Sequence, residues 1–308
     1  MAPLALETVI VLATIGGLWL GARLLVDGAS ALAARLGVSR LVIGLTVVAF
    51  GTSMPEFAVT TEAALAGRGD IAVGNVVGSN VFNLGFVLGI TALLGTLDRT
   101  RRLVHRDGFV LVLASIALLV VLWDGQLSRL EGGVFMAGLV AYLLVLVRSG
   151  AIATVAEPAD PTNPAVDAAR LAGGLVFVVV SARLLIDSAS TIAAAAGISE
   201  WAIGVTVVAA GTSTPELVTA LVAARRGQSG LSVGSLLGSD LFNVLGVLGL
   251  AGLLQPLAVS SEATWSVVWL LGTVLLVVAL LWTGRQLTRL EGAALLVLAG
   301  IRWAINLV

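Results

Sequence analysis

The 308-residue sequence contains no cysteine and a single histidine, His105. The lack of cysteine excludes disulfides, thiolate metal sites and cysteine catalysis. With only one histidine, most histidine-based catalytic triads and multi-histidine metal sites are excluded as well. Charged residues are also scarce, at 11% of the chain, whereas they make up about a quarter of a soluble domain. With 58% hydrophobic residues and a mean hydropathy of +1.08, the chain is predicted to be an integral membrane protein. Its net charge of -1 gives no indication of a nucleic-acid partner, and no obligate protein partner is implied.

The hydrophobic residues form ten candidate membrane spans if about 20 apolar residues are needed to cross the hydrocarbon. Continuous apolar character over such lengths indicates helices rather than barrel strands, in which polar and apolar residues alternate. The spans lie near residues 6–26, 41–65, 71–95, 108–123, 131–147, 171–190, 201–223, 231–254, 265–282 and 291–307. Between the fifth and the sixth, the prolines and acids of residues 148–170 are typical of a solvated linker. We expect no cleavable signal, because the first span lacks a basic start and a small-residue cleavage pattern.

The two halves of the chain repeat each other at a constant offset of 160 positions. "IGLTVVAFGTSMPE" at 43–56 matches "IGVTVVAAGTSTPE" at 203–216, and "VGNVVGSNVFNLGFVLG" at 73–89 matches "VGSLLGSDLFNVLGVLG" at 233–249. Because each copy has an odd number of spans, the two copies must cross the membrane in opposite senses. The sequence therefore predicts ten transmembrane helices in two inverted five-helix repeats, at 1–147 and 171–308, an arrangement typical of secondary transporters.

Arginine placement predicts the orientation of this array in the membrane. With the N-terminus outside, 13 of the 17 arginines fall on the cytoplasmic side, which positive residues favour. We therefore expect a multi-pass plasma-membrane protein with the linker 148–170 in the cytoplasm and both termini outside.

A proline followed by a glutamate interrupts the second span. Pro55 has no amide hydrogen and its ring clashes with the carbonyl four residues back, so we expect the helix to break around residues 51–53. Glu56 lies in the first turn of the resumed helix, where the helix dipole favours a negative charge. Free carbonyls and an acid are tolerated at this depth only where they line a cavity or bind a ligand. Since Glu216 repeats the pattern, two carboxylates from opposite halves are predicted to form one cation-binding centre.

Hydroxyl and amide side chains could complete this centre. Ser79 and Asn83 are four positions apart and share a helical face, as do Ser239 and Asn243. Oxygens of these groups suit Na⁺ and Ca²⁺, which takes about six to eight oxygen ligands, although such side chains can also bridge helices without binding an ion. Asp240, next to Ser239, is open to two interpretations: a polar contact away from the ions, or a role in steering or protonation.

These motifs resemble the two alpha-repeats of the calcium:cation antiporter superfamily, particularly its prokaryotic sodium/calcium exchangers. The resemblance rests on "GTSMPE" and "GTSTPE", each followed by "GSNVFN" or "GSDLFN", and it covers both halves. It implies an antiporter that is not an enzyme, needs no cofactor, and exchanges Ca²⁺ for Na⁺ by alternating access. By motif position, it assigns ion binding to Glu56, Glu216, Thr52, Thr212, Ser53, Ser213, Ser79, Ser239, Asn83 and Asn243. Several relatives, including potassium-dependent ones, carry Asp at the position of Asn243, so a requirement for K⁺ is left open.

Three other functions would fit parts of the sequence. A proton/calcium exchanger would use the same glutamates as proton carriers, and a channel would pass ions without coupling them. An intramembrane hydrolase based on Ser53 or Ser213 would lack a histidine partner and would leave the second copy unexplained.

Overall fold

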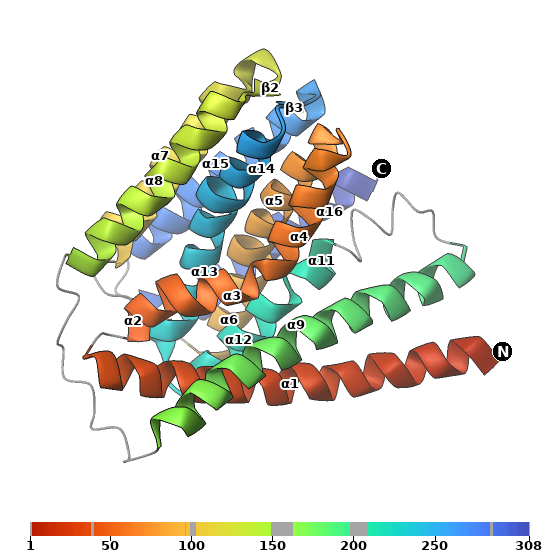
Figure 1. Cartoon of the computed structure of the whole chain (residues 1–308), viewed down its shortest axis with the longest axis vertical. Helices are drawn as coiled ribbons and strands as arrows, with labels where there is room; N and C mark the ends of the chain where they lie inside the picture. The colour runs from red at the N-terminus through yellow and green to blue at the C-terminus, as the bar shows by residue number, and fades with distance from the viewer. Residues whose placement is uncertain are drawn as a thin grey trace.

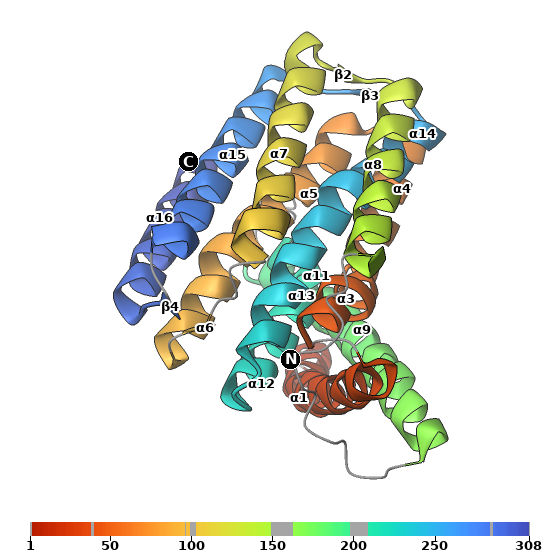
Figure 2. The same ribbon diagram turned by 90° about the vertical axis from the view of Figure 1, so that its left-hand side faces the viewer.

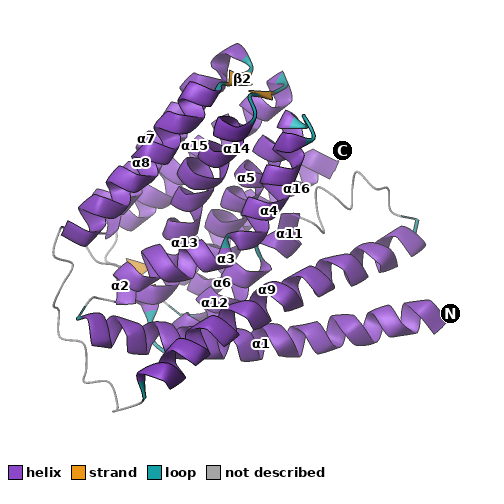
Figure 3. Ribbon diagram, viewed as in Figure 1, coloured by secondary structure: helices purple, strands orange, loops and turns teal. Residues whose placement is uncertain are grey.

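A computed structural model describes residues 2–37, 40–95, 97–98, 103–148, 163–197, 209–283 and 286–307. Within these ranges the chain is helical apart from turns and four two-residue strands (Figure 3). Seven helices in this part of the chain are long and apolar enough to span a membrane: Leu4–Leu36, Gly69–Leu94, Arg106–Asp124, Arg129–Leu146, Pro164–Ala189, Ser229–Leu254 and Ser261–Thr283. The prediction of an all-α polytopic membrane protein is thereby confirmed.

Of the other three predicted spans, one is broken, one is partly described and one is a single helix. Span 41–65 is divided into α2 (Arg40–Ile43), the π-helix η1 (Gly44–Val48), α3 (Ala49–Thr52) and α4 (Met54–Leu65). Residues 198–208 lie outside the described residues, and α11 (Ala209–Thr212) and α12 (Thr214–Arg225) follow them. The last predicted span, 291–307, falls within α16 (Arg289–Leu307), which carries Arg302.

The two longest helices, α1 (Ala2–Leu36) and α9 (Pro164–Ala195), pack against each other at one edge of the molecule (Figure 1). They cross the other helices at a steep angle, and Figure 2 shows α1 almost end-on. Glycines permit the close approach: a Cβ atom on Gly28 would lie 2.7 Å from the Leu171 Cα atom. Beyond the glycines, the Arg35 guanidinium donates to Asp167 at 2.8 Å and ties the end of α1 to the first turn of α9.

Helix α9 begins inside the segment 148–170 that the sequence suggested as a linker. Pro164 stands at the start of the helix, where its missing amide hydrogen costs nothing. The Asn163 side chain accepts a hydrogen bond from the Ala165 amide at 3.0 Å and caps the helix. Since α8 (Arg129–Arg148) extends to Arg148 and α9 starts at Pro164, only residues 149–163 separate the two helices.

The centre of the bundle consists of two composite helices that occupy corresponding positions in the two halves. One is α5 (Gly69–Phe82), η2 (Asn83–Val87) and α6 (Leu88–Leu94); the other is α13 (Ser229–Leu241), η6 (Phe242–Val247) and α14 (Leu248–Leu254). Helix α6 packs against α16 as α14 packs against α8, and α7 (Phe109–Val121) packs against α15 (Ser261–Thr283) (Figure 2). The short elements η3 (Leu103–Gly108) and η4 (Leu122–Asp124) flank α7.

The strands connect the two halves at their loops. β1 (Leu97–Asp98) pairs antiparallel with β4 (Gln286–Leu287), and β2 (Gln126–Leu127) pairs antiparallel with β3 (Leu257–Ala258). Position 257 lies 160 residues after 97, and 287 lies 160 after 127, so the two ladders are equivalent under the repeat.

Polarity is distributed in the opposite way from a water-soluble protein. Large apolar side chains are exposed on the outside, for example Trp123 at 78% and Leu290 at 81%. Acids, amides and hydroxyls are buried instead, among them Glu56, Glu216 and Asp240. Lipid solvates apolar side chains but not polar ones, so polar groups gather inside, where they meet one another.

Candidate functional site

The two Pro-Glu segments break their helices at equivalent residues. Helix α3 ends at Thr52 and α4 starts at Met54, with Ser53 between them at φ -80° and ψ 5°. In the second half Ser213 adopts φ -86° and ψ 5° between α11 and α12. The predicted interruption around residues 51–53 is therefore confirmed, and the first turns of α4 and α12 contain Glu56 and Glu216.

Each glutamate accepts a hydrogen bond from the serine of the other half. Ser53 Oγ donates to Glu216 Oε1 at 3.3 Å, and Ser213 Oγ donates to Glu56 Oε1 at 3.3 Å. Both carboxyl groups are fully enclosed, at 0% and 1% exposure. The two broken segments thus meet in one centre, to which each half contributes an acid and a hydroxyl.

Hydroxyl pairs extend the same reciprocal pattern to the central helices. Thr52 Oγ1 lies 3.3 Å from Ser239 Oγ, and Ser79 Oγ lies 3.4 Å from Thr212 Oγ1. Positions 52 and 212, like 79 and 239, are related by the 160-residue offset. The hydroxyls on α5 and α13 therefore contact the breaks of the opposite half.

Asn83 and Asn243 lie where α5 and α13 widen into π-helices. Asn83 is the first residue of η2, and Asn243 is the second of η6. A π-turn shifts the helical register locally and is frequent at functional sites. Both side chains are fully buried, so they project within the bundle rather than toward lipid.

Four buried oxygen atoms of these side chains have no hydrogen-bond partner: Glu56 Oε2, Glu216 Oε2, Asn83 Oδ1 and Asn243 Oδ1. They come in equivalent pairs from the two halves. A buried oxygen without a partner costs about 1–3 kcal/mol, and more if it is charged, unless a ligand satisfies it. The ion pairs found among the described residues involve Asp27, Asp107 and Asp167, not either glutamate.

The donor set suits a hard cation. The centre combines the carboxylates of Glu56 and Glu216 with neutral hydroxyl and amide oxygens. In the described part of the chain no three His, Cys, Asp or Glu side chains gather as a metal site. Hydroxyl, amide and carboxylate oxygens are the ligands that Ca²⁺ prefers. All ten side chains that the sequence predicted as ion ligands are at least 99% buried. Reciprocal hydrogen bonds link the two glutamates and all six hydroxyls across the halves.

Two further residues belong to the same cluster. Asn83 Nδ2 donates to Asp240 Oδ1 at 3.0 Å, and Asn243 Nδ2 donates to Asn80 Oδ1 at 2.9 Å. The sequence left two interpretations of Asp240 open, a polar contact or a role in steering or protonation. In the structure Asp240 accepts a hydrogen bond from the side-chain amide of Asn83. Asn80 was not singled out, although its place in "GSN", equivalent to "GSD", is a signal that could have found it.

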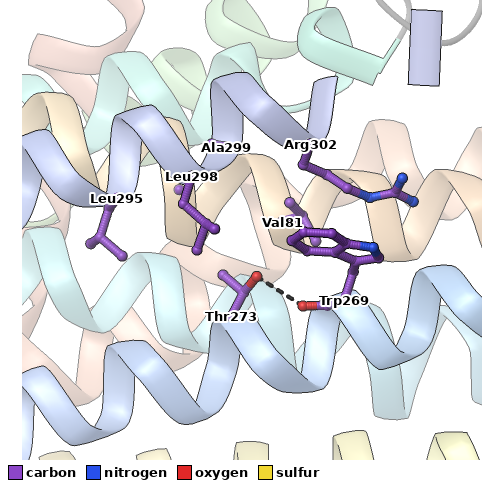
Figure 4. A pocket seen from close by; sticks show the side chains of 8 residues that line it. Val81, Trp269, Thr273, Leu295, Leu298, Ala299 and Arg302 are labelled. Carbon is purple, nitrogen blue, oxygen red and sulfur yellow. Dashed lines mark hydrogen bonds between the residues drawn. The ribbon is translucent and has the colours of Figure 1, made fainter. Parts of the chain in front are cut away.

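A separate pocket lies between α15 and α16 and does not fit a cation (Figure 4). Its walls include Val81, Leu295 and Leu298. Arg302, at its edge, donates to Ser266 at 2.8 Å and lies over the ring of Trp269. A positive group and apolar walls make this pocket unsuitable for a cation.

Comparisons with known proteins identify relatives along most of the chain. The family described as "Sodium/calcium exchanger protein" matches residues 6–148 and 167–307. The sodium/calcium exchanger MaX1 of Methanosarcina acetivorans is 30% identical, over 90% of this chain and 91% of that protein. Inner membrane protein YrbG of Escherichia coli is 36% identical, over 75% of each chain. A solved structure of the sodium-calcium exchanger NCX_Mj superimposes with a TM-score of 0.88 and 31% identity, over 98% of this chain and 99% of that one.

Proposed function

Because this chain belongs to the sodium/calcium exchanger family, within the calcium:cation antiporter superfamily, we propose that it exchanges Ca²⁺ for Na⁺ at a centre built on Glu56 and Glu216. Membership makes it a multi-pass membrane transporter for cations rather than an enzyme. The paired glutamates, the choice of Na⁺ and the plasma-membrane location are the specific parts of the proposal.

The observation that carries the proposal is the reciprocal contact of the two halves. Ser53 donates to Glu216, Ser213 donates to Glu56, and each glutamate keeps one oxygen without a partner. A Ca²⁺ ion would bind both carboxylates and neutralise their two negative charges. Ca²⁺ takes about six to eight oxygen ligands, so its remaining ligands would be drawn from the amide oxygens of Asn83 and Asn243 and the hydroxyls of Thr52, Thr212, Ser53, Ser213, Ser79 and Ser239.

Shared use of these oxygens would couple the two ions. Several Na⁺ ions at overlapping positions would compensate the same charges, so Na⁺ and Ca²⁺ would exclude each other. An empty centre would keep two carboxylates buried in the membrane without a counter-ion, which is costly. The unloaded protein would therefore convert slowly between inward-open and outward-open forms, and transport would be an exchange.

Ten helices in two inverted repeats, residues 1–147 and 171–308 with the linker between them, would provide the alternating access. The equivalent helix breaks, strand ladders and hydrogen bonds at a 160-residue offset support this organisation. Pairing of α1 with α9 through close glycine contacts supports their movement as one unit past the centre. Both termini would lie outside the cell.

Transport by purified protein in liposomes tests the proposal. Radioactive calcium is supplied outside, and an outward gradient of Na⁺, K⁺ or H⁺ is imposed in separate samples. We expect uptake with the Na⁺ gradient and none with K⁺ alone. Uptake driven only by the pH gradient would make the protein a proton/calcium exchanger, and calcium-dependent current without any counter-ion would make it a channel.

A further inference from the structure

Each buried asparagine that we assign to the ion centre donates its amide nitrogen to a residue that we do not. Asn83 Nδ2 donates to Asp240 Oδ1 at 3.0 Å, and Asn243 Nδ2 donates to Asn80 Oδ1 at 2.9 Å. All four side chains are fully buried. Positions 80 and 240, like 83 and 243, are separated by the repeat offset, so the two bonds are one contact made twice.

An amide that donates through its nitrogen must present its oxygen on the other branch. The Oδ1 atoms of Asn83 and Asn243 are the ones that have no partner in the protein. If either amide rotated by half a turn, the NH₂ group would replace the oxygen, and an N–H donor cannot bind a cation. The acceptor at position 80 or 240 therefore decides whether the asparagine is a ligand.

We infer that Asp240 and Asn80 are positioning residues, which orient the amide oxygens of Asn83 and Asn243, respectively, toward the transported cation without binding it themselves. Asp240 acts on Asn83, and Asn80 acts on Asn243. The inference rests on the proposed function of the glutamate centre. It assigns Asp240 a role as a hydrogen-bond acceptor, not as an additional ion-binding charge.

Positions 80 and 240 differ in one respect, because residue 80 is an asparagine and residue 240 an aspartate. Asn80 also donates its own amide nitrogen to the main-chain oxygen of Asp240 at 3.1 Å. The equivalent of this bond in the other half would run from a side-chain nitrogen at position 240 to the main-chain oxygen of Asn80. Because residue 240 is an aspartate, it has Oδ2 in place of that nitrogen, and Oδ2 lacks a hydrogen-bond partner. Asparagine at 240 would keep the acceptor for Asn83 and supply the missing donor. The acceptor, rather than the carboxylate charge, is what the site requires.

The test compares Asp240→Asn with Asp240→Ala in purified full-length protein, by equilibrium calcium binding and by Na⁺-driven calcium uptake. We expect Asp240→Ala to weaken calcium binding about 10–100-fold, the usual effect of losing a partner of a metal ligand. The half-saturating calcium concentration should rise while the maximal rate at saturating calcium changes less. Asp240→Asn should bind calcium as the wild type does. Asn75→Ala is the matched control, because Asn75 lies on α5, the central helix that carries Asn80 and leads into Asn83. It removes the 3.0 Å hydrogen bond from the side-chain amide nitrogen of Asn75 to Thr60, and it should leave calcium binding unchanged.

A double variant separates positioning from a general structural effect. If Asp240 acts through Asn83, Asp240→Ala should cost little further affinity once Asn83→Ala is present. If Asp240→Ala does not yield folded protein, Asn80→Ala tests the equivalent contact to Asn243, with the same expected loss. The inference is overturned if Asp240→Asn loses as much affinity as Asp240→Ala, if the alanine variants bind normally, or if the two substitutions are additive. Failure of wild-type Na⁺-driven uptake would instead refute the proposed function, and the binding measurement would still decide the orientation of the amides.

Discussion

Replacing either glutamate of the centre by glutamine should abolish calcium exchange and leave the fold intact. Ser53 donates to Glu216 Oε1 and Ser213 donates to Glu56 Oε1, and the carbonyl oxygen of a glutamine can accept the same bond. The amide nitrogen then takes the place of Oε2, which has no partner. Glu56→Gln and Glu216→Gln thus remove one charge and one ligand oxygen at nearly constant shape.

The expected loss follows from the charge that is removed. Two unit charges about 4 Å apart attract each other by about 4 kcal/mol at an effective dielectric constant near 20, and a divalent ion doubles this to about 8 kcal/mol. Desolvation of the ion and the carboxylate offsets part of the attraction. If desolvation offsets about half of the attraction, each glutamate contributes a net of about 4 kcal/mol to calcium binding. Its replacement should then weaken binding about a thousandfold, since about 1.4 kcal/mol corresponds to a tenfold change in affinity. The thermal stability of the ion-free protein should be unchanged or higher, because a buried charge has been removed.

Calcium uptake into Na⁺-loaded liposomes and calcium-dependent thermal unfolding measure the two effects separately. Calcium should raise the unfolding temperature of the wild type and of neither glutamine variant, because only a ligand that binds the folded state stabilises it. Glu62→Gln is the matched control, since this exposed acid lies on the same helix α4 and should transport normally. Wild-type uptake with unchanged calcium dependence in either Glu56→Gln or Glu216→Gln would refute the paired-carboxylate centre.

Three further predictions address the topology, the charge of the centre and the packing of α1 against α9. Single cysteines introduced into this cysteine-free chain at Ala159 and Val308 should react with an impermeant reagent from opposite sides of the membrane; reaction from one side would refute the inverted repeats. Asn243→Asp adds a carboxylate to a centre that two Na⁺ ions or one Ca²⁺ ion would neutralise, so it should alter the Hill slope for Na⁺ or the competition with Ca²⁺ more than Asn83→Ala does. An unchanged slope and calcium affinity across a pH series would show that position 243 does not set the charge. Gly174→Val should separate α1 from α9, because a Cβ atom there would lie 2.8 Å from the Gly21 oxygen; we expect lost transport and about 1–3 kcal/mol lower stability. Its control is Gly173→Val, since a Cβ atom on Gly173 meets nothing within 4 Å, and equal behaviour of the two variants in uptake and thermal unfolding would contradict close packing of this pair.

The grouping of acids and hydroxyls that we propose as the ion centre was largely predictable, because these polar residues stand in apolar spans. An acid after a proline in an apolar span is costly unless it has a function, and its recurrence 160 residues later indicated a paired site. The structure brings Glu56 and Glu216 into contact with the opposite serines, as the repeat suggested. Helical spacing predicted only that the Ser79 and Ser239 hydroxyls share a helix face with the nearby asparagines. In the structure, each of these hydroxyls contacts a threonine of the other half.

Other features depend on contacts that a linear pattern does not contain. Helix α1 spans Ala2–Leu36, well beyond the predicted 6–26, because an apolar window measures the hydrocarbon and not the helix. Its end is held by the bond from Arg35 to Asp167, residues 132 positions apart. The contact of Asp240 was equally hard to predict: its partner Asn83 lies in the other half, and no spacing rule predicts which amide atom faces it.

The most direct test of the central claim is the position of a bound ion. Crystals of the protein soaked with Sr²⁺, a heavier analogue of Ca²⁺, would show the ion by its anomalous signal. We predict one strong peak between Glu56 and Glu216, in direct contact with an oxygen of each and with the amide oxygens of Asn83 and Asn243, at distances slightly longer than those of about 2.3–2.6 Å in Ca²⁺ sites because Sr²⁺ is the larger ion. The peak should fade as Na⁺ is raised. A strong peak that contacts neither glutamate, or one that high Na⁺ leaves unchanged, would contradict a shared centre for the two ions.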